Sequence, residues 1–254
     1  MNLLLLAGAS ETGSIAKALS LEGFHVLVST VSDFPMEIGL SELVTRRVGA
    51  LSAEELSALC VEMNVAAIVD ATHPYAVQAH ANAKDSAQQL GVPSFRYERP
   101  SAASHGQGIH PAMSHEEAAK LAVSFKRPIL LTSGTRNLEP YATLARSKGI
   151  ELYVRALDCE DSRDAIVRRG IPLEHCEFGV GPFTVEDNIR IMEKFDIGVL
   201  VTKDGGVAGG LPDKLEASRR MNCQVVLVSR PVACFDDVYD DIPSLVRAVK
   251  SILP

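Results

Sequence analysis

The chain has 254 residues, of which 46% are hydrophobic and 22% are charged, and its formal net charge is −7. Such a composition is typical of a globular protein, and the length suits one large α/β domain or two small ones. The negative charge and the absence of Lys/Arg-rich runs argue against nucleic acid as the main partner.

Strand-like and helix-like runs alternate through the first hundred residues. Apolar runs predict strands, while helical spacing and capping residues predict the helices between them. The expected strands are 2–7, 25–30, 65–69 and 94–97, and the expected helices are 14–21, 52–63 and 75–90. Residues 100–111, PSAASHGQGIHP, are rich in Gly, Pro and small polar residues, which is typical of a linker.

The same alternation resumes after the linker. The expected strands are 128–132, 151–155, 197–202 and 225–229, and the expected helices are 138–148, 184–194, 214–221 and 242–252. Continuous apolar strands alternating with helices are typical of parallel sheets covered on both faces. We therefore expect two α/β units, an N-terminal dinucleotide-binding domain at 1–103 and a second domain at 104–254.

The segment LLLAGASETG, residues 4–13, predicts a strand, a turn of small residues and a helix start. Gly8 allows a sharp turn, Ser10 is small, and Gly13 begins the helix, whose free N–H groups and dipole favour a phosphate. The spacing departs from the common G-x-G-x-x-G pattern. Its place in the first β–α turn nevertheless favours a nucleotide site over a purely structural turn.

The second strand ends in hydroxyl residues. Ser29, Thr30 and Ser32 stand where enzymes that prefer the dinucleotide without a 2′-phosphate often carry an acid. Hydroxyls can donate hydrogen bonds to a phosphate, and Arg46 and Arg47 could add positive charge. A hydroxyl-rich loop without a ligand is an equal alternative.

The segment DATHPYA, residues 70–76, follows a β-branched strand. Ligands of open parallel sheets bind at the carboxyl ends of the strands, so this location favours a function over packing. Pro74 biases His73 towards an extended backbone, which would hold the imidazole at the edge of the sheet. A structural histidine is the alternative, and Asp70 could simply cap the next helix.

Cationic side chains follow several successive strands. They are Arg99, Arg136, Lys203, Lys214 and Arg230, with Asp204 beside Lys203. Each could be a solvated charge next to a turn. Their recurrence at strand ends predicts a site for a polyanion, because guanidinium groups pair well with carboxylates.

The cysteines and the N-terminal apolar run indicate the cellular compartment of the protein. An odd number of cysteines without metal-ligand spacing indicates reduced thiols, rather than a disulfide framework or a zinc site. The apolar run at 2–7 is short and lacks a preceding basic segment, so it indicates a buried strand rather than a signal peptide. No apolar run is long enough to span a membrane. We therefore expect a cytoplasmic protein without a metal site or a membrane partner.

In order along nearly the whole chain, LLLAGASETG, DATHPYA, RYERP, TSGTRNL, GPFTVEDN, VTKDGGVAGGLPDK and VVLVSRP resemble the precorrin-6A reductase family of corrin-ring (cobalamin) biosynthesis. One position departs from the family pattern, since Gly205 stands where a Ser usually follows the Lys-Asp pair. The resemblance implies two Rossmann-like parallel-sheet domains with a cleft between them. It also implies NADPH-dependent reduction of one carbon–carbon double bond in a carboxylate-rich tetrapyrrole, precorrin-6A or its cobalt form.

The resemblance also implies roles for individual residues. The nucleotide would lie on the first turn, with Ala71 and Thr72 beside its nicotinamide. The proton donor would be His73 or Asp204, with Tyr75 behind them. The cations after the strands would bind the carboxylates of the substrate, and other enzymes of the corrin pathway could receive the product by channelling.

Two other classes of protein remain open. A short-chain dehydrogenase would share the first turn, but none of the five tyrosines has a lysine four positions later. A non-catalytic NADPH-binding sensor would share the fold, and the cation-rich strand ends of the second half argue against it.

Overall fold

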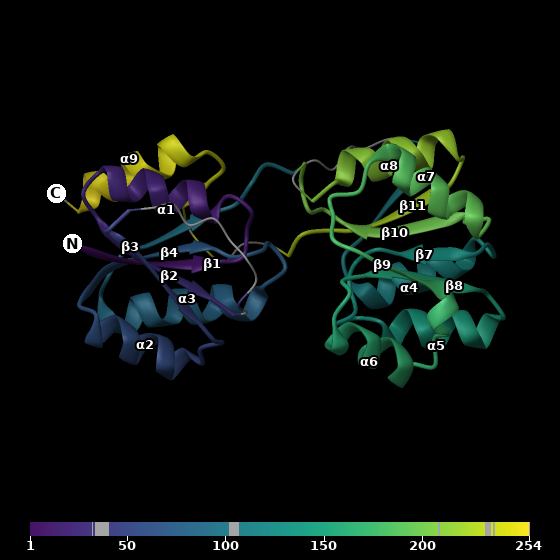
Figure 1. Ribbon diagram of the computed structural model, residues 1–254, viewed down its shortest axis with the longest axis horizontal. Helices are drawn as coiled ribbons and strands as arrows, with labels where there is room; N and C mark the ends of the chain where they lie inside the picture. Colours follow the sequence, from purple (N-terminus) through teal and green to yellow (C-terminus); the bar gives the residue numbers. More distant parts are fainter. Residues whose placement is uncertain are drawn as a thin grey trace. The chain divides into compact units, whose positions relative to one another are not determined.

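The chain forms two compact units in the computed structural model, which describes residues 1–31, 33, 41–101, 107–207, 209–231, 235 and 237–253. The first unit comprises residues 1–100 and 231–254, and the second comprises residues 101–230. Ser32, Cys234 and residues 102–106 of the expected linker lie outside the described residues. Both termini belong to the first unit (Figure 1).

The first unit contains a six-stranded sheet in the order β12-β5-β4-β1-β2-β3, and all of its described pairings are parallel. The strands are β1 (Asn2–Ala7), β2 (His25–Thr30), β3 (Val44–Val48), β4 (Val65–Ala71), β5 (Ser94–Tyr97) and β12 (Val238–Tyr239). Helices α1 (Thr12–Leu21) and α9 (Ile242–Ile252) cover one face, and α2 (Ala53–Glu62) and α3 (Val77–Leu90) cover the other (Figure 1). Read from β3, this is the doubly wound Rossmann order, with the switch point between β1 and β4.

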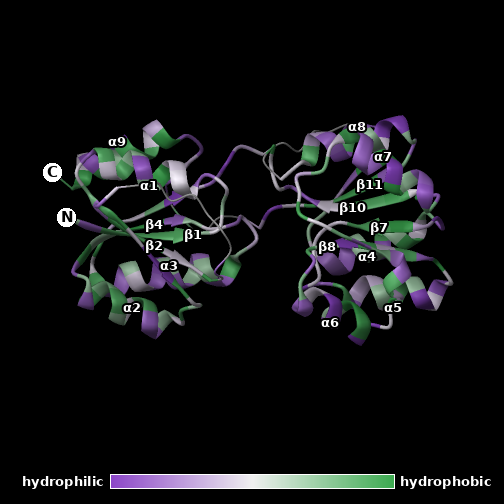
Figure 2. Ribbon diagram, in the orientation of Figure 1, coloured by the Kyte–Doolittle hydropathy of each residue, from purple (hydrophilic) through white to green (hydrophobic). Residues whose placement is uncertain are grey.

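The central strand β1 shows why this sequence forms a sheet covered on both sides. Leu3 and Leu5 belong to the core cluster that contains residues of α1 and α9, whereas Leu4 and Leu6 belong to the cluster with Leu56 of α2. Successive side chains of a strand point to opposite faces, so an unbroken apolar run is stable only when both faces are buried. Figure 2 shows β1 as hydrophobic and the helices as mixed.

The second unit contains another six-stranded sheet with parallel pairings, in the order β6-β11-β10-β7-β8-β9. The strands are β6 (Ile109–Ala112), β7 (Ile129–Leu131), β8 (Leu152–Ala156), β9 (Cys176–Phe178), β10 (Val199–Lys203) and β11 (Gln224–Val228). Helices α4 (His115–Ser124), α5 (Glu139–Lys148) and α6 (Glu160–Arg168) cover one face, and α7 (Val185–Lys194) and α8 (Leu211–Arg220) cover the other (Figure 1). A short 3-10 helix, η1 (Leu173–His175), precedes β9.

The strand orders confirm the prediction of two Rossmann-like parallel sheets, and they correct the domain assignment. We expected the second domain to run to the end of the chain, but β12 pairs with β5 and α9 packs on α1 in the first unit. The two sheets have equivalent strand orders. The edge strand beside β5 in the first sheet is β12, and the edge strand beside β11 in the second sheet is β6. Alternation along the sequence predicts elements but not the sheet that each one joins. The cleft between the two domains stays a prediction.

Within the described residues, no helix is long and apolar enough to cross a membrane. The four described cysteines, Cys60, Cys159, Cys176 and Cys223, are free thiols.

Candidate functional site

The turn after β1 is packed directly against the turn after β4. A Cβ added to Gly8 would lie 3.0 Å from the backbone nitrogen of His73 and 3.1 Å from Cα of Thr72. The backbone nitrogen of Ala9 donates to the carbonyl of Ala71 over 3.0 Å. Gly8 is therefore required for the close approach of these two turns, which meet at the switch point of the sheet. The structure thus brings Gly8, Ala71, Thr72 and His73 together.

A carboxylate that was not predicted from the sequence lies at the start of α1. Glu11 is the N-cap residue of α1. One of its oxygens, Oε2, accepts a hydrogen bond from Ser10 Oγ over 3.0 Å and lies 3.1 Å from Nη2 of the buried Arg99. Arg99, expected at a substrate carboxylate, is thus placed in the first unit, beside the predicted phosphate turn. Gly13 lies in the first helical turn, whose leading N–H groups lack acceptors within the helix.

Asp70 is the centre of a buried network rather than a helix cap. Its Oδ1 accepts hydrogen bonds from Thr72 N over 2.9 Å, Thr72 Oγ1 over 2.7 Å and Arg96 Nη1 over 3.1 Å. Its Oδ2 lies 2.7 Å from Nδ1 of His80 in α3. Burial acts to raise the pKa of Asp70, but the hydrogen bonds to His80 and Thr72 and the charges of Arg96 and His80 together outweigh it, so the pKa is lowered.

The same network fixes the backbone of the turn that carries His73. Arg96 Nη1 also donates to the carbonyls of Asp70 and Thr72, over 3.2 and 3.0 Å. His80 Nε2 lies 3.3 Å from the carbonyl of Pro74. Because Asp70 and Arg96 are 0% and 1% exposed, these contacts form in a dry interior where they hold the turn firmly.

His73 is half-buried at the end of this turn. Its Nδ1 accepts from the backbone nitrogen of Tyr75 over 3.4 Å, and the two rings lie 5.5 Å apart at 36°. Tyr75 precedes α3, so the helix begins two residues later than we expected. The imidazole of His73 and the phenol ring of Tyr75 therefore lie side by side at the carboxyl edge of the sheet, beside Gly8.

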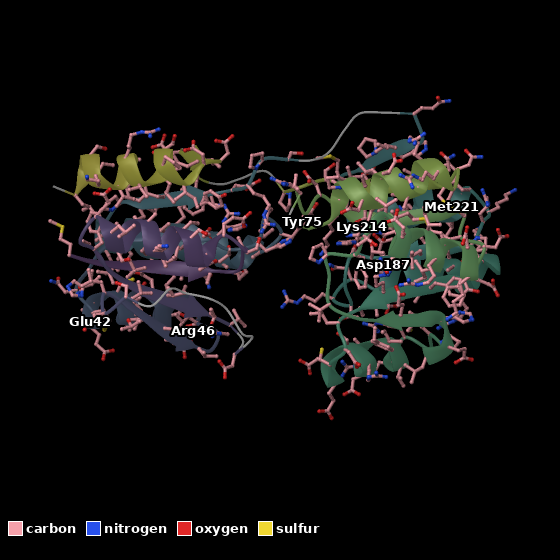
Figure 3. All side chains as sticks on the ribbon, turned by 45° about the horizontal axis from the view of Figure 1, so that its top comes forward. Glu42, Arg46, Tyr75, Asp187, Lys214 and Met221 are labelled. Carbon is pink, nitrogen blue, oxygen red and sulfur yellow. The ribbon has the colours of Figure 1, made fainter. Side chains whose placement is uncertain are left out.

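The hydroxyls at the end of β2 face arginines of β3, a strand that the sequence analysis missed. Arg47 Nη1 donates to Ser29 Oγ over 2.9 Å, and Arg46 Nε donates to Thr30 Oγ1 over 3.2 Å. Parallel pairing makes Ser29 and Arg47 direct neighbours. Figure 3 labels Arg46 on this strand; its guanidinium lies 3.7 Å from Asp33.

In the second unit, the switch point lies between β7 and β10, and Asp204 and Arg230 are paired beside it. Arg230 Nε lies 3.0 Å from Asp204 Oδ2 and donates to the Asp204 carbonyl over 3.1 Å. Ser101 Oγ and Gly206 N also donate to this carboxylate, over 2.6 and 3.1 Å. Asp204 is 3% exposed, and its carboxylate oxygens accept these hydrogen bonds in the interior of the protein. The pair therefore orders the glycine-rich turn after β10.

Lys203 and Arg136 form a cationic group at the same edge. Lys203 ends β10, and Arg136 follows β7, the neighbouring strand. Burial lowers the pKa of Lys203, and the charge of Arg136 acts in the same direction. A nearby anion would offset the repulsion that Arg136 exerts on the Lys203 ammonium.

Lys214, on α8, belongs to a different group of residues, which includes Arg155 of β8 and Asn188 of α7. Its Nζ donates to the carbonyl of Gly209 over 3.1 Å. Burial lowers the pKa of Lys214 to about 8, and the charge of Arg155 acts in the same direction. Arg155 in turn donates to Asn188 Oδ1 over 2.6 Å and lies 4.0 Å from the ring centre of Phe183. Figure 3 labels Lys214.

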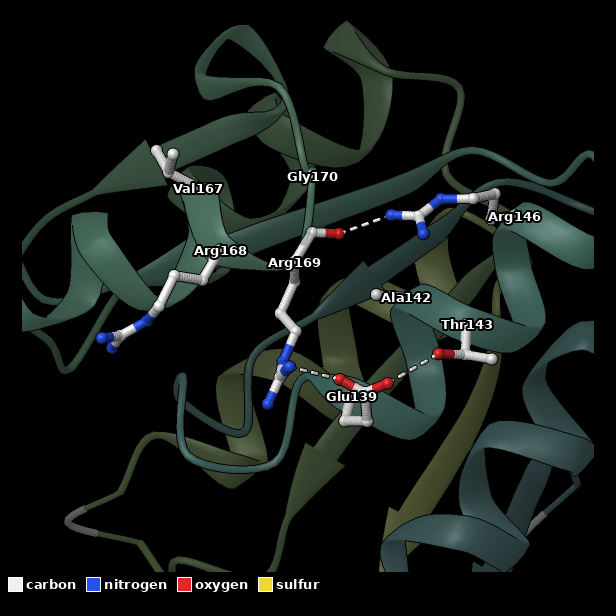
Figure 4. Close-up of a pocket in the computed structure, with 8 residues that line it drawn as sticks. All are labelled: Glu139, Ala142, Thr143, Arg146, Val167, Arg168, Arg169 and Gly170. Atoms are coloured by element: carbon white, nitrogen blue, oxygen red, sulfur yellow. Dashed lines mark hydrogen bonds and ion pairs between the residues drawn. The ribbon is translucent and has the colours of Figure 1, made fainter.

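A cavity of about 350 Å³ lies away from these strand ends, between α5 and the end of α6 (Figure 4). Arg169 Nη1 lies 2.6 Å from Glu139 in this cavity, and Arg146 donates to the carbonyl of Arg169 over 2.5 Å. None of the predicted site residues lines it.

The roles of Glu11, His80 and Arg96 were not predicted from the sequence. Arg96 offered a signal, because it alternates with the apolar Phe95 and Tyr97 in a strand expected to be buried on both faces. A guanidinium there requires a buried acid, and Asp70 at the end of the adjacent strand is such an acid. His80 gave no comparable signal, since it lies in a helix rich in small polar residues.

Comparisons with known proteins agree along the whole chain. Residues 2–250 match the family model described as Precorrin-6x reductase CbiJ/CobK. The chain is 30% identical over 249 residues to the cobalt-precorrin-6A reductase of Priestia megaterium, covering 97% of each chain. It is 32% identical over 236 residues to the precorrin-6A reductase of Rhodococcus erythropolis, covering 90% of this chain and 89% of the relative. A solved structure titled CobK precorrin-6A reductase has the same fold, with a TM-score of 0.79, 22% identity, and coverage of 100% of this chain and 97% of that chain.

Proposed function

The chain belongs to the precorrin-6x reductase family, and from this premise we propose that its first unit binds NADPH and its second unit binds the carboxylates of a tetrapyrrole. The protein is an oxidoreductase of cobalamin biosynthesis that reduces a carbon–carbon double bond of precorrin-6A or its cobalt form. The observation that carries the proposal is the packing of Gly8 against Thr72 and His73, which joins the nucleotide turn to the turn of DATHPYA.

The residues around β1 and β2 fit a phosphorylated dinucleotide. The start of α1 offers N–H groups and a positive dipole end to the pyrophosphate, near Gly8, Ser10 and Gly13. The Ser29 hydroxyl can donate to a 2′-phosphate, and Arg46 and Arg47, held against the hydroxyls of Thr30 and Ser29, add guanidinium donors and positive charge. This pairing supports NADPH over NADH as the cofactor.

The bound cofactor supplies a hydride to one carbon of the double bond, and the neighbouring carbon must receive a proton. A donor has to lie within hydrogen-bond reach of that carbon or act through one water. We propose His73 as this donor, oriented by Tyr75, because it is half-buried at the sheet edge beside the nucleotide turn. Asp204 accepts from Arg230, Ser101 and Gly206, which supports a positioning role for it rather than proton donation.

The cations of the second unit would bind the substrate. Lys203 and Arg136 lie at the switch point, and Lys214 lies on α8. An acetate or propionate group of the substrate could offset the hydration that these cations lose on burial. Arg230 acts through Asp204, and Arg99 lies beside the phosphate turn. We also propose the cytoplasm as the compartment, where free thiols persist, and corrin-pathway enzymes as recipients of the product.

The test is a reaction of the purified protein with the tetrapyrrole and NADPH under anaerobic conditions. The absorbance of reduced nicotinamide should fall in step with a shift of the tetrapyrrole spectrum. NADH in place of NADPH should give a much lower kcat/KM. A protein that binds NADPH but leaves both precorrin-6A and its cobalt form unchanged would contradict the proposal.

A further inference from the structure

His115 lies at the carboxyl edge of the second sheet, where α4 begins, and it was not among the residues predicted from the sequence. Its Nδ1 lies 2.8 Å from the hydroxyl of Tyr141 in α5, and the two rings are nearly perpendicular, at 82°. Tyr141 is 0% exposed. A completely buried tyrosine thus holds the orientation of a half-buried imidazole at the edge where the substrate is proposed to bind.

Two charged side chains influence the pKa of His115, those of Lys203 and Glu116. Burial lowers the pKa of His115 to about 4, the positive charge of Lys203 acts in the same direction, and Glu116 opposes it. Burial also raises the pKa of Tyr141. At neutral pH the imidazole is therefore neutral and the phenol keeps its proton.

A neutral imidazole carries one hydrogen, and the Tyr141 contact decides where it is useful. When the Tyr141 hydroxyl donates to Nδ1, Nε2 carries the hydrogen and becomes a donor for a further group. The turn after β7 holds two more polar side chains that a carboxylate could contact. Arg136 is exposed there, and the hydroxyl oxygen of Ser133 is buried without a hydrogen-bond partner.

We propose that His115 is a carboxylate-binding residue of the second unit, positioned by Tyr141 and acting together with Lys203 and Arg136 on one acetate or propionate group of the tetrapyrrole. The proposal rests on the reductase function proposed above. Two cations and a neutral donor complement a carboxylate better than three cations, because they add a hydrogen bond without a further charge to desolvate. The alternative is that His115 only packs against Tyr141.

The experiment separates these two roles by comparing substitutions at His115. His115→Leu removes the donor, whereas His115→Gln retains an amide donor near the position of Nε2. Tyr141→Phe removes the hydroxyl that fixes the imidazole, and Lys120→Gln, an exposed position on the same helix, serves as the matched control. Each variant is titrated with uroporphyrin, a stable tetrapyrrole with acetate and propionate side chains, and its KM and kcat are measured with precorrin-6A. Circular dichroism checks that each variant is folded.

For His115→Leu we expect the Kd for uroporphyrin and the KM to rise about tenfold or more, since a hydrogen bond to a charged group contributes about 1.5–3 kcal/mol. His115→Gln should recover most of this loss, Tyr141→Phe should be intermediate, and Lys120→Gln and the Kd for NADPH should not change. Equal uroporphyrin affinity in the wild type and His115→Leu would overturn the subsite even if the wild type reduces precorrin-6A. Binding of uroporphyrin that depends on His115, without turnover of precorrin-6A, would support the subsite and remove the reductase function instead.

Discussion

At the scale of single residues, His73 is the side chain whose proposed role is chemical. Asn in its place keeps hydrogen-bonding capacity but cannot exchange a proton near neutral pH. For His73→Asn we expect kcat to fall by about 10²–10⁴-fold, the range for loss of a general acid, while the Kd for NADPH stays unchanged. The limb of the pH–rate profile that belongs to the imidazole should disappear.

His25→Asn, at the exposed start of β2, is the control for this experiment, because it removes an imidazole far from the turn after β4. Near-normal turnover of His73→Asn with an unchanged pH profile would assign proton delivery to water. His73 would then only orient the reactants.

Glu11 places a negative charge where the pyrophosphate is expected. It engages both Ser10 and Arg99, two donors that could otherwise contact the nucleotide. For Glu11→Gln we expect NADPH to bind about two- to fivefold more tightly. A carboxylate at the positive end of the helix dipole is stabilised by about 0.3–1 kcal/mol, and without it the pyrophosphate no longer competes for that end. Calorimetric titration measures this, with Glu22→Gln at the other end of α1 as control. Weaker binding would mean that Glu11 positions Arg99 for the cofactor rather than competing with it.

Arg47 tests the preference between the two nicotinamide cofactors. Replacing it by Gln removes the guanidinium bonded to Ser29. The Kd for NADPH should rise about tenfold or more, as for the loss of one hydrogen bond to a charged group, and the Kd for NADH should change less than about twofold. Lys17→Gln, on the exposed side of α1, should affect neither. An equal loss of affinity for both cofactors would argue that Arg47 supports the fold of β2 and β3 and does not contact a 2′-phosphate.

At the scale of secondary-structure elements, Asp70 joins β4, β5 and α3 through Arg96 and His80. For Asp70→Asn we expect the free energy of unfolding at pH 7 to fall by about 3–5 kcal/mol, because the buried Arg96 loses its acid. Urea unfolding measures the loss, and Asp85→Asn on the exposed side of α3 should cost little.

The same substitution should change how stability depends on pH. The pKa of Asp70 is lower in the folded protein than its usual 3.8. The stability that its charge contributes is therefore complete above about pH 4 and is lost as the pH falls through the folded value. The difference between the wild type and Asp70→Asn should shrink in that acidic range. A difference that stays constant down to the acid unfolding transition would show that the Asp70 charge is not the source of the stability.

A cap alone did not decide which elements were predicted from the sequence, since α4 was missed although Ser114 caps it as Ser52 caps α2. The apolar run of β1 was predicted at its observed bounds, and the helix predicted at 52–63 is α2, which begins one residue later and ends one residue earlier. β3 was missed because Thr45, Arg46 and Arg47 interrupt it with polar side chains, as an edge strand allows. The residues of the candidate site also fall into those that the sequence predicted and those that it did not. Groups at strand ends follow from the parallel sheet, whereas the contacts of Glu11, His80 and His115 depend on tertiary packing.

At the scale of the whole molecule, the order of the strands predicts which parts of the chain can fold alone. The second unit is continuous in sequence, and its edge strand β6 precedes its other strands. The first unit requires the C-terminal segment, since Leu245, Val246 and Val249 of α9 are buried in its core. Burial of one such side chain contributes about 1.5–3 kcal/mol, so three of them are comparable to the total stability of a domain.

We therefore expect a fragment of residues 101–230 to unfold cooperatively in urea, with the far-ultraviolet circular dichroism of an α/β protein. A fragment of residues 1–100 should lack a cooperative transition. Joining residues 1–100 to residues 231–254 through a short Gly/Ser linker should restore it, together with NADPH binding, because this fusion again supplies β12 and α9. Substituting Val249→Asp in the fusion should abolish the transition, whereas Lys250→Gln, next to it and exposed, should not. A cooperative transition and NADPH binding in residues 1–100 alone would show that the first unit does not depend on the returning C-terminal segment.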